Sequence, residues 1–411
     1  MEISAAKIIL ANLRDRIETG SDGKHRLSGI LTQTELDALN LVIASHGDVL
    51  ATSAGINVEP VVPLHSEAIS ALITKNADEP IVAVDLSTLA LPAVQSSYRV
   101  CLDFGTAMSK ASLVHDDDLT EDIRVLKLGI PGDQEQVDEN MLVSSVFIDT
   151  EELIWFGQKA VGQSQNVVEG SHARMDNIKR ALSEGNLAEP LDAKFNPTQQ
   201  SLIYEDMVLA YLAFFTWTIN EALAVEVEGI TQNFFRRFAM PCFPRANARI
   251  VEPKLKVLLG EAQVLADTFG AEIHDGLPLK KLLSALRQLR SEKRTYDFIG
   301  ESVTEPLGVA GSLLSWRNSH DSLALVVDIG AGTSDFSLYR LHVTEDEDGS
   351  FRSVAGEVDG TARGITEAGN HLDKILMAFI LSKSDVDSTH PKYINITHAL
   401  ERDIRQHKEA L

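Results

Sequence analysis

Two stretches of the chain share one pattern of hydrophobic and polar positions. Residues 100–114 read VCLDFGTAMSKASLV, and residues 323–341 read LALVVDIGAGTSDFSLYRL. In each stretch an apolar run ends at an aspartate, a glycine-containing turn follows, and a strand pattern resumes. Both stretches are therefore predicted to be β-hairpins, with Asp103 or Asp328 at the end of the first strand.

The pattern around these hairpins predicts an α/β protein. Further strands are expected at 123–129, 144–149, 153–158 and 236–243, and helices at 200–227, 248–270 and 279–294. Strands and helices alternate after residue 200, as they do in α/β folds. The apolar run 207–220 is shorter than the roughly 20 residues that a membrane helix needs, so it is expected to be a buried core helix.

The length of 411 residues favours more than one domain. Residues 1–95 are expected to form a helical N-terminal domain, in which Thr32 and Glu35 have capping-box spacing and SEAISALITK forms a second helix. The segment 80–99 is either an edge strand or a linker, because Pro92 is unsuited to a central strand. Residues 96–318 and 319–411 are expected to form the two remaining parts.

Composition narrows the range of partners. The net charge of −23 argues against nucleic acid or an anionic membrane as the main partner. The two cysteines, Cys101 and Cys242, lie in apolar strand-like runs and are expected to be free thiols, and the first residues lack the pattern of a signal peptide. A reduced cytoplasm is the expected compartment. The basic helix 279–294 is either a solvated face or a docking surface.

The two aspartate–glycine turns suggest a site for phosphate. Glycine lets backbone N–H groups approach an anion closely, and the hydroxyl of Thr106 or Thr333 can donate to phosphate oxygens. Asp103 and Asp328 would then lie beside the phosphates and hold Mg²⁺, mostly through its water shell. One such turn is equally consistent with an ordinary tight turn. Two of them in one chain favour a clamp for a polyphosphate.

These two segments resemble the phosphate 1 and phosphate 2 motifs of the superfamily that joins actin, sugar kinases and the 70-kDa heat-shock chaperones. IGESVTEPLGVAGSLLSW resembles the connecting helix of the chaperone branch, which begins with Glu-Pro. WFGQKAVGQ followed by DNIKRALSEG resembles the segment that carries the active-site lysine of that branch, and AGNHLDKIL resembles its helix start Gly-Gly-x-x-Phe-Asp. The resemblance covers residues 98–411.

The resemblance implies an actin-like ATPase fold, which is ribonuclease H-like, with two lobes that follow the small helical N-terminal domain. It implies a chaperone-like ATPase that hydrolyses ATP to ADP with Mg²⁺ and couples lobe movement to a protein client or partner. Catalysis would involve Glu305, Lys179, Asp103 and Asp328, and the two aspartates would also hold the metal. The nucleotide would be bound by Gly105, Thr106, Ala107, Met108, Lys110, Gly330, Ala331, Gly332, Thr333 and Gly369.

Departures from the family pattern leave alternatives open. Ala107 and Met108 stand where the chaperones have a second threonine and a polar residue, whereas Lys110 matches a phosphate-contacting lysine of actin. The chain has no Gly-Gly pair, so the adenosine motif of the family is missing and the second lobe is expected to be incomplete, as in a fragment. The alternative is a nucleotide-sensing or inactive scaffold. A sugar kinase is less favoured, because the Glu-Pro helix is a chaperone trait.

Two residues also have a plain structural interpretation. Glu305 is either a base that positions water or a helix-start glutamate favoured by the helix dipole. Lys179 either orients the γ-phosphate and the attacking water or is one surface lysine beside Arg180.

Overall fold

The chain divides into two units, Met1–Asp78 and Glu79–Leu411. The computed structural model describes the following residues: 17–19, 25–27, 82–92, 97–116, 121–129, 138–165, 173–176, 178–227, 231–240, 245–312, 320–345, 349, 351–365, 368–390, 393, 396, 397, 400, 404 and 408. In the first unit these residues form an antiparallel pair, β1 (Ile17–Thr19) and β2 (His25–Leu27). The two helices expected in this unit lie outside the described residues.

The second unit is built on a mixed six-stranded sheet, called here the first sheet. Its strands run in the order β11-β9-β3-β4-β5, and β6 pairs with β4. Strands β3, β4 and β5 form an antiparallel meander, whereas β9 and β11 run parallel to β3. The bounds are β3 Tyr98–Asp103, β4 Met108–Asp116, β5 Glu121–Val125, β6 Leu142–Val143, β9 Arg236–Met240 and β11 Ile299–Thr304.

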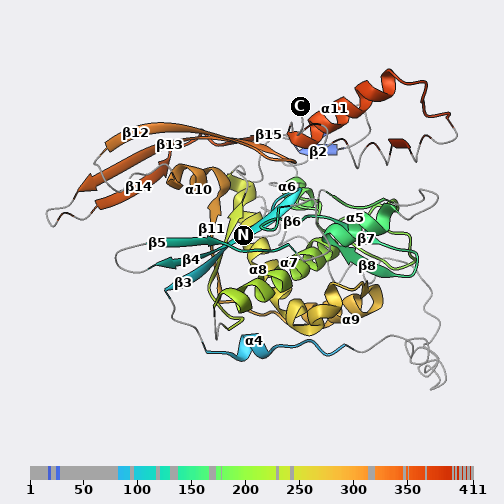
Figure 1. Ribbon diagram of the computed structural model, residues 1–411, viewed down its shortest axis with the longest axis horizontal. Coiled ribbons are helices and arrows are strands. Elements are labelled where there is room, and N and C mark those ends of the chain that lie inside the picture. The colour runs from blue at the N-terminus through green and yellow to red at the C-terminus, as the bar shows by residue number, and fades with distance from the viewer. Residues whose placement is uncertain are drawn as a thin grey trace, which may run out of the picture. The chain divides into compact units, whose positions relative to one another are not determined.

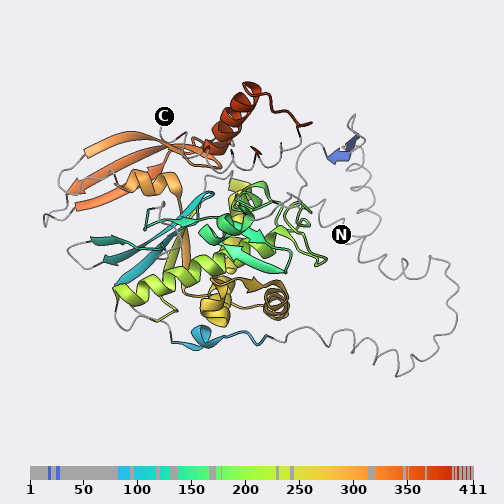
Figure 2. The same ribbon diagram turned by 45° about the vertical axis from the view of Figure 1, so that its right-hand side comes forward.

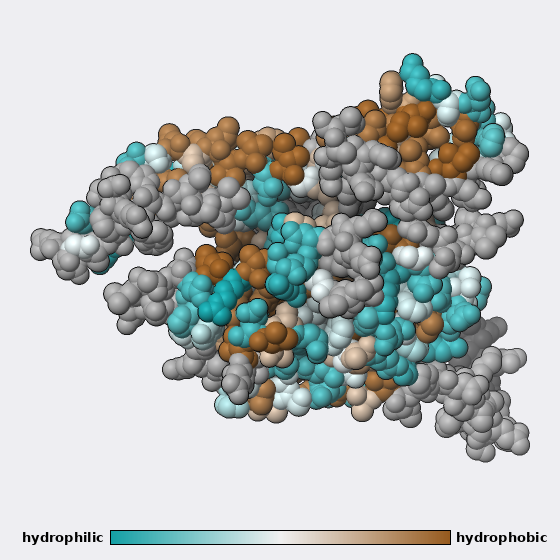
Figure 3. Space-filling model, viewed as in Figure 1, coloured by the Kyte–Doolittle hydropathy of each residue, from teal (hydrophilic) through white to brown (hydrophobic). Residues whose placement is uncertain are grey.

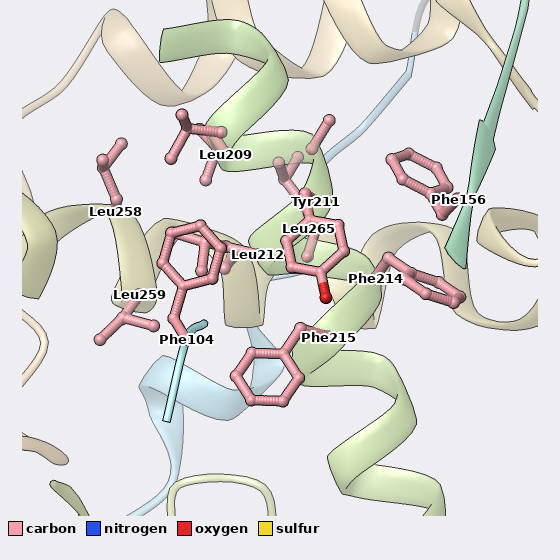
Figure 4. Packing of buried hydrophobic residues seen from close by; sticks show 14 of the residues in the cluster. Phe104, Phe156, Leu209, Tyr211, Leu212, Phe214, Phe215, Leu258, Leu259 and Leu265 are labelled. Atoms are coloured by element: carbon pink, nitrogen blue, oxygen red, sulfur yellow. The ribbon is translucent and has the colours of Figure 1, made fainter. Parts of the chain in front are cut away.

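Two long helices, α7 (Tyr204–Glu226) and α8 (Arg245–Phe269), pack on each other and on the first sheet (Figures 1 and 2). Tyr211 and Phe214 of α7 are buried, and Tyr211 lies between Phe214 and Phe104 at the end of β3 (Figure 4). Within the described residues α7 is the one helix long and apolar enough to span a membrane, but 72% of its apolar window is buried inside the protein. This confirms the prediction of a core helix over the apolar run.

Helix α8 begins earlier than the sequence pattern suggested. It starts at Arg245, so Pro253 lies inside the helix and not near its first turn. The shorter helix α9 (Leu279–Arg290) follows and buries one apolar face, including Leu282 and Leu286. Most cations of its basic face pair with acids; Lys281, for example, bonds Glu272.

A small antiparallel sheet in the order β10-β8-β7 adjoins this core. Its strands are β7 Val146–Ile148, β8 Leu153–Phe156 and β10 Leu277–Pro278. Helix α5 (Gly157–Gln165) follows β8 directly, and the short helix α6 (Arg180–Glu184) follows an extended segment. That segment forms a two-way backbone bridge between Met175 and Val146 of β7.

The second sheet follows helix α10 (Glu305–Ser312), which contacts strands of both sheets (Figures 1 and 2). Its order is β12-β13-β14, and β15 also pairs with β13. The bounds are β12 His320–Ile329, β13 Ser334–Glu345, β14 Phe351–Glu357 and β15 Arg363–Ile365, and helix α11 (Gly369–Ser382) follows. One face of this sheet covers a small core with Ala310 of α10.

The opposite face of β12 carries exposed apolar side chains. Leu323, Leu325 and Ile329 alternate along the strand and are each about two-thirds exposed. This apolar surface is visible over β12 in Figure 3, and a second apolar surface lies on α11. In the described part of the chain β12 pairs with β13 alone, and no described strand lies along its other edge.

The segment 82–92 belongs to the second unit, although the sequence placed a boundary near residue 95. It runs extended and contains the short helix α4 (Ser87–Ala90). Its backbone donates to side chains of α8 and α9, as from Asp85 to Thr268 at 2.9 Å. The Thr88 hydroxyl donates to Asp267 at 2.6 Å. The prediction left an edge strand and a linker open, and the structure has a strap across two helices instead.

Candidate functional site

The turn between β3 and β4, residues 104–107, is called loop 1. Phe104 is buried and stacks on Tyr211 of α7, with ring centroids 5.6 Å apart. The Tyr211 hydroxyl donates to Ser109 at 3.0 Å, just after the loop. A Cβ at Gly105 would lie 1.9 Å from the carbonyl oxygen of Met108, so another residue would force the loop to shift. Loop 1 is therefore anchored at both ends and requires glycine.

The turn between β12 and β13, residues 330–333, is called loop 2. A hydrogen bond from the Gly330 N–H to the Thr333 carbonyl at 2.9 Å closes this turn. The start of α11 is tied to it, because Gly369 donates to the Gly330 carbonyl at 3.0 Å and Asn370 donates to the Ala331 carbonyl at 2.8 Å. The first turn of α11 thus holds loop 2 through two backbone hydrogen bonds.

The two loops have the same construction and touch each other. Asp103 pairs with Lys110 across the first hairpin, and Asp328 pairs with Asp335 across the second, so the two turns have equal length. A Cβ built at Gly332 would lie 2.6 Å from the side chain of Thr106. The repetition in the sequence is therefore also a repetition in space, with the two turns tip to tip.

Lys179 and Glu305 form a buried ion pair beside these turns. The Lys179 Nζ donates to the Glu305 Oε1 at 2.5 Å, and the two side chains are 7% and 17% exposed. Glu305 is the first residue of α10, and Lys179 immediately precedes α6. The two residues are separated by 126 positions in the sequence.

Asp103, Lys110, Glu305 and Asp328 line one pocket of about 550 Å³ on the outer face of the first sheet. Burial raises the pKa of Asp103; the nearby charges of Glu305 and Asp328 act in the same direction, and Lys179 and Lys110 oppose it. Burial likewise raises the pKa of Asp328, with Glu305 adding to the rise. The carboxylates of the two hairpins thus share one electrostatic environment.

Not every residue expected to bind phosphate is available in this structure. The Thr333 hydroxyl donates to Asp335 at 3.0 Å, and the Gly369 N–H is taken by loop 2. In this structure these two groups therefore support the loop. In the described part of the chain, no hydrogen bond joins the N–H of Thr106, Ala331 or Gly332 to another protein atom.

The remaining loop residues lie as neighbours of this site. The carbonyl of Ala107 accepts from Ser144 at 2.8 Å, and Met108 pairs with Val143 of β6. Both residues are thus tied to the strand beside loop 1 through their backbone. Lys110 is exposed and faces Asp103 across the hairpin.

The donor set fits Mg²⁺ only in combination with a ligand. Within the described residues no group of three or more His, Cys, Asp or Glu side chains could hold a metal ion. Magnesium is commonly held by one or two carboxylates together with water and substrate phosphates. Asp103 and Asp328 on one pocket suit that arrangement, and a cage made of protein ligands alone does not fit.

Sequence reasoning missed the supports of the site. Tyr211, Ser109 and Ser144 form a buried hydroxyl cluster with oxygen distances of 3.0–3.1 Å under loop 1. A tyrosine within the apolar run of α7 was the available signal, because a buried hydroxyl needs a partner. Asp335, which accepts the hydrogen bond from Thr333 of loop 2, is also buried, with 2% of its surface exposed.

No protein-family model matches the chain, and a search of curated proteins finds no match.

Proposed function

We propose that this chain binds a magnesium nucleotide, ATP or ADP, through loop 1 and loop 2. One observation carries the proposal: two hairpins of equal construction touch at their loops and direct Asp103 and Asp328 to one pocket. Backbone N–H groups without protein partners in such turns form anion sites. Two loops of this kind, each next to a carboxylate, suit a polyphosphate with its divalent cation.

The proposed fold is that of an actin-like ATPase with two lobes, related to the 70-kDa heat-shock chaperones. The first sheet would belong to one lobe and the second sheet to the other. Helix α10 supports this assignment, since it contacts strands of both sheets and begins with a residue that lines the pocket. Movement of one sheet against the other about α10 would report the bound nucleotide to a protein partner in the cytoplasm.

In this proposal each charged group has a separate task. Asp103 and Asp328 would hold Mg²⁺, which neutralises phosphate charge when it is bound. Lys110 would contact phosphate oxygens from the floor of the pocket. Glu305 would position water for in-line attack, and Lys179 would hold the Glu305 carboxylate in place.

Calorimetry with this chain tests the binding proposal. The described loops offer ligands for the phosphates and the metal, and the sequence has no adenosine motif, so we expect a Kd near millimolar, about −4 kcal/mol, with little difference between ATP and GTP. Removal of Mg²⁺ and the change Asp103→Asn should each abolish binding. Absence of heat with both nucleotides at saturating Mg²⁺ would overturn the proposal.

A nucleotide-sensing scaffold without turnover is the second candidate. It is favoured by Ala107 and Met108 in loop 1 and by the direct Lys179–Glu305 bond, which engages the proposed water-positioning group. Steady-state release of phosphate from ATP distinguishes the two. If the enzyme is active, Glu305→Gln should slow release by about 10² or more, whereas nucleotide affinity changes little. Equal, background-level release by both proteins would favour the scaffold.

A further inference from the structure

The floor of the pocket has two rows of side chains. Asp103 and Lys110 face each other in the row next to loop 1. One step further from the loop, Cys101 of β3 lies between Ser112 of β4 and Arg237 of β9. Residues two apart on a strand point to the same face, so both rows line the same pocket.

Arg237 is a cation at the end of the pocket that the proposed function does not use. Two residues along a strand span about 6.7 Å, so the row that contains Arg237 lies about that far from the Asp103 row, on the side away from loop 1. Its side chain is exposed, and within the described residues it forms no ion pair. The three carboxylates Asp103, Glu305 and Asp328 belong to the other end of the pocket.

Arg237 is one of several exposed cations without an ion pair in the described part of the chain, as Arg249 and Lys256 of α8 are. Other cations, on helices α5 and α9, are matched with acids, as in Lys159–Asp275, Lys280–Glu152 and Arg290–Asp206. Lys110 and Arg237 are exposed cations of one pocket, and in the described residues neither has an acid partner within 4 Å. A dianion would therefore find two cations in this pocket that form no direct ion pair with a described residue.

The geometry lets these two side chains serve one anion. Lys110 and Arg237 lie on the strands that flank β3, and neighbouring strands are about 4.8 Å apart, so their Cα atoms are roughly 12 Å apart on the diagonal. Both side chains are long, and a guanidinium binds phosphate through two parallel hydrogen bonds. The hydroxyl of Ser112 completes the row as a neutral donor.

We infer that Arg237, with Lys110 and Ser112, forms a phosphate subsite behind the Asp103 row. The inference rests on the proposed function for the choice of phosphate as the anion. The shared chemistry is a phosphate dianion, which is either free orthophosphate or the terminal phosphoryl group of a nucleotide. The sequence alone does not predict this subsite, because RRFAM contains two adjacent arginines and does not show which one faces the pocket. In the structure Arg236 is buried and only Arg237 faces the pocket.

Binding of inorganic phosphate without metal or nucleotide tests the subsite. We expect calorimetry or ³¹P line broadening to show saturable binding, and Arg237→Gln to weaken it at least tenfold. The matched control is Arg249→Gln, which removes an exposed arginine from α8 outside the pocket and should change nothing. Equal urea midpoints of the two variants would show that the fold is intact. Phosphate binding that is absent in the wild type, or unchanged in Arg237→Gln, would overturn the inference.

Two further titrations separate the sources of the phosphate. Orthophosphate that binds equally well in the presence of Mg·ADP would identify a site for free phosphate. Weaker binding of ATP but not of ADP by Arg237→Gln would identify a site for the terminal phosphoryl group. Asp103→Asn separates this inference from the proposed function. It should abolish Mg·nucleotide binding but leave metal-free phosphate binding, whereas loss of both would contradict a separate subsite.

Discussion

Replacement of Lys179 by methionine should destabilise the protein far more than the loss of an ordinary surface charge. The Lys179 side chain is 7% exposed and bonds Glu305, which is 17% exposed, at 2.5 Å. Removal of one member of a buried ion pair typically costs 3–5 kcal/mol, because the other charge remains buried without compensation. Glu305 keeps some access to water, so we expect about 3 kcal/mol.

The same structure predicts how the loss is recovered. The double variant Lys179→Met/Glu305→Gln removes both charges, and we expect it to regain about 2 kcal/mol relative to Lys179→Met alone. Lys127→Met is the control, because Lys127 pairs with Glu139 at 2.9 Å but both side chains are more than 60% exposed. Loss of that pair should cost under about 1 kcal/mol.

Urea unfolding followed by tryptophan fluorescence measures all three variants. Trp155 and Trp217 lie in the second unit, so the signal reports its unfolding. A shift in the midpoint without a change in the slope gives the free-energy difference. If Lys179→Met costs no more than Lys127→Met, or if the double variant is no more stable than the single one, the ion pair does not have the role described above. The assay also matters for kinetics, since low activity of a Lys179 variant is informative only when the protein is folded.

Three further predictions concern other parts of the second unit. Folding raises the pKa of Asp103 above its ordinary 3.8, so the free energy of unfolding should fall as pH rises from about 3.8 through the higher folded-state pKa. Asp103→Asn should make this fall smaller and be more stable than the wild type at pH 7, as urea titrations at pH 4 and 7 can show. Gly332→Ala should lower the free energy of unfolding by about 1–3 kcal/mol and weaken nucleotide binding, because its Cβ would lie 2.6 Å from Thr106. The control Gly162→Ala, in open space on α5, should be neutral or stabilising. Equal effects of the two substitutions would contradict close contact of the loops. Thr88→Val should cost about 1.5–3 kcal/mol in the same assay, because a carboxylate on α8 loses a donor at 2.6 Å, and an unchanged midpoint would mean that the strap does not stabilise the unit.

The sequence predicted the elements that depend on local pattern. The two hairpins and the buried helix over the apolar run follow from periodicity and glycine, whereas the helix that begins at Glu305 was implied by the resemblance to the chaperones. Interactions that depend on tertiary packing were not predictable in the same way. One example is the hydrogen bond from the Thr333 hydroxyl to the buried Asp335 carboxylate. Asp335 is buried because β13 is a central strand, with β12 and β15 on either side.

The limits of an element were also set by tertiary contacts. The segment 82–92 has no strong pattern of its own, and its backbone donors find side chains of α8 and α9 as partners. The position of Arg237 was likewise not predictable from the sequence, because only the register of β9 against β3 decides which of two adjacent arginines faces the pocket.

The edge of β12 that no described strand covers affects how this chain behaves in solution. The same positions of the first hairpin, Val100, Leu102 and Phe104, are covered by the helical layer and at most 3% exposed, whereas Leu325, Val327 and Ile329 are 48–68% exposed. A long apolar edge strand is a template for pairing with other chains. The net charge of −23 opposes such association at low ionic strength, but the Debye length falls from about 10 Å at 0.1 M salt to about 3 Å at 1 M. Colloidal stability of the chain should therefore decline with added salt, and dilute buffers are the suitable medium for the titrations described above.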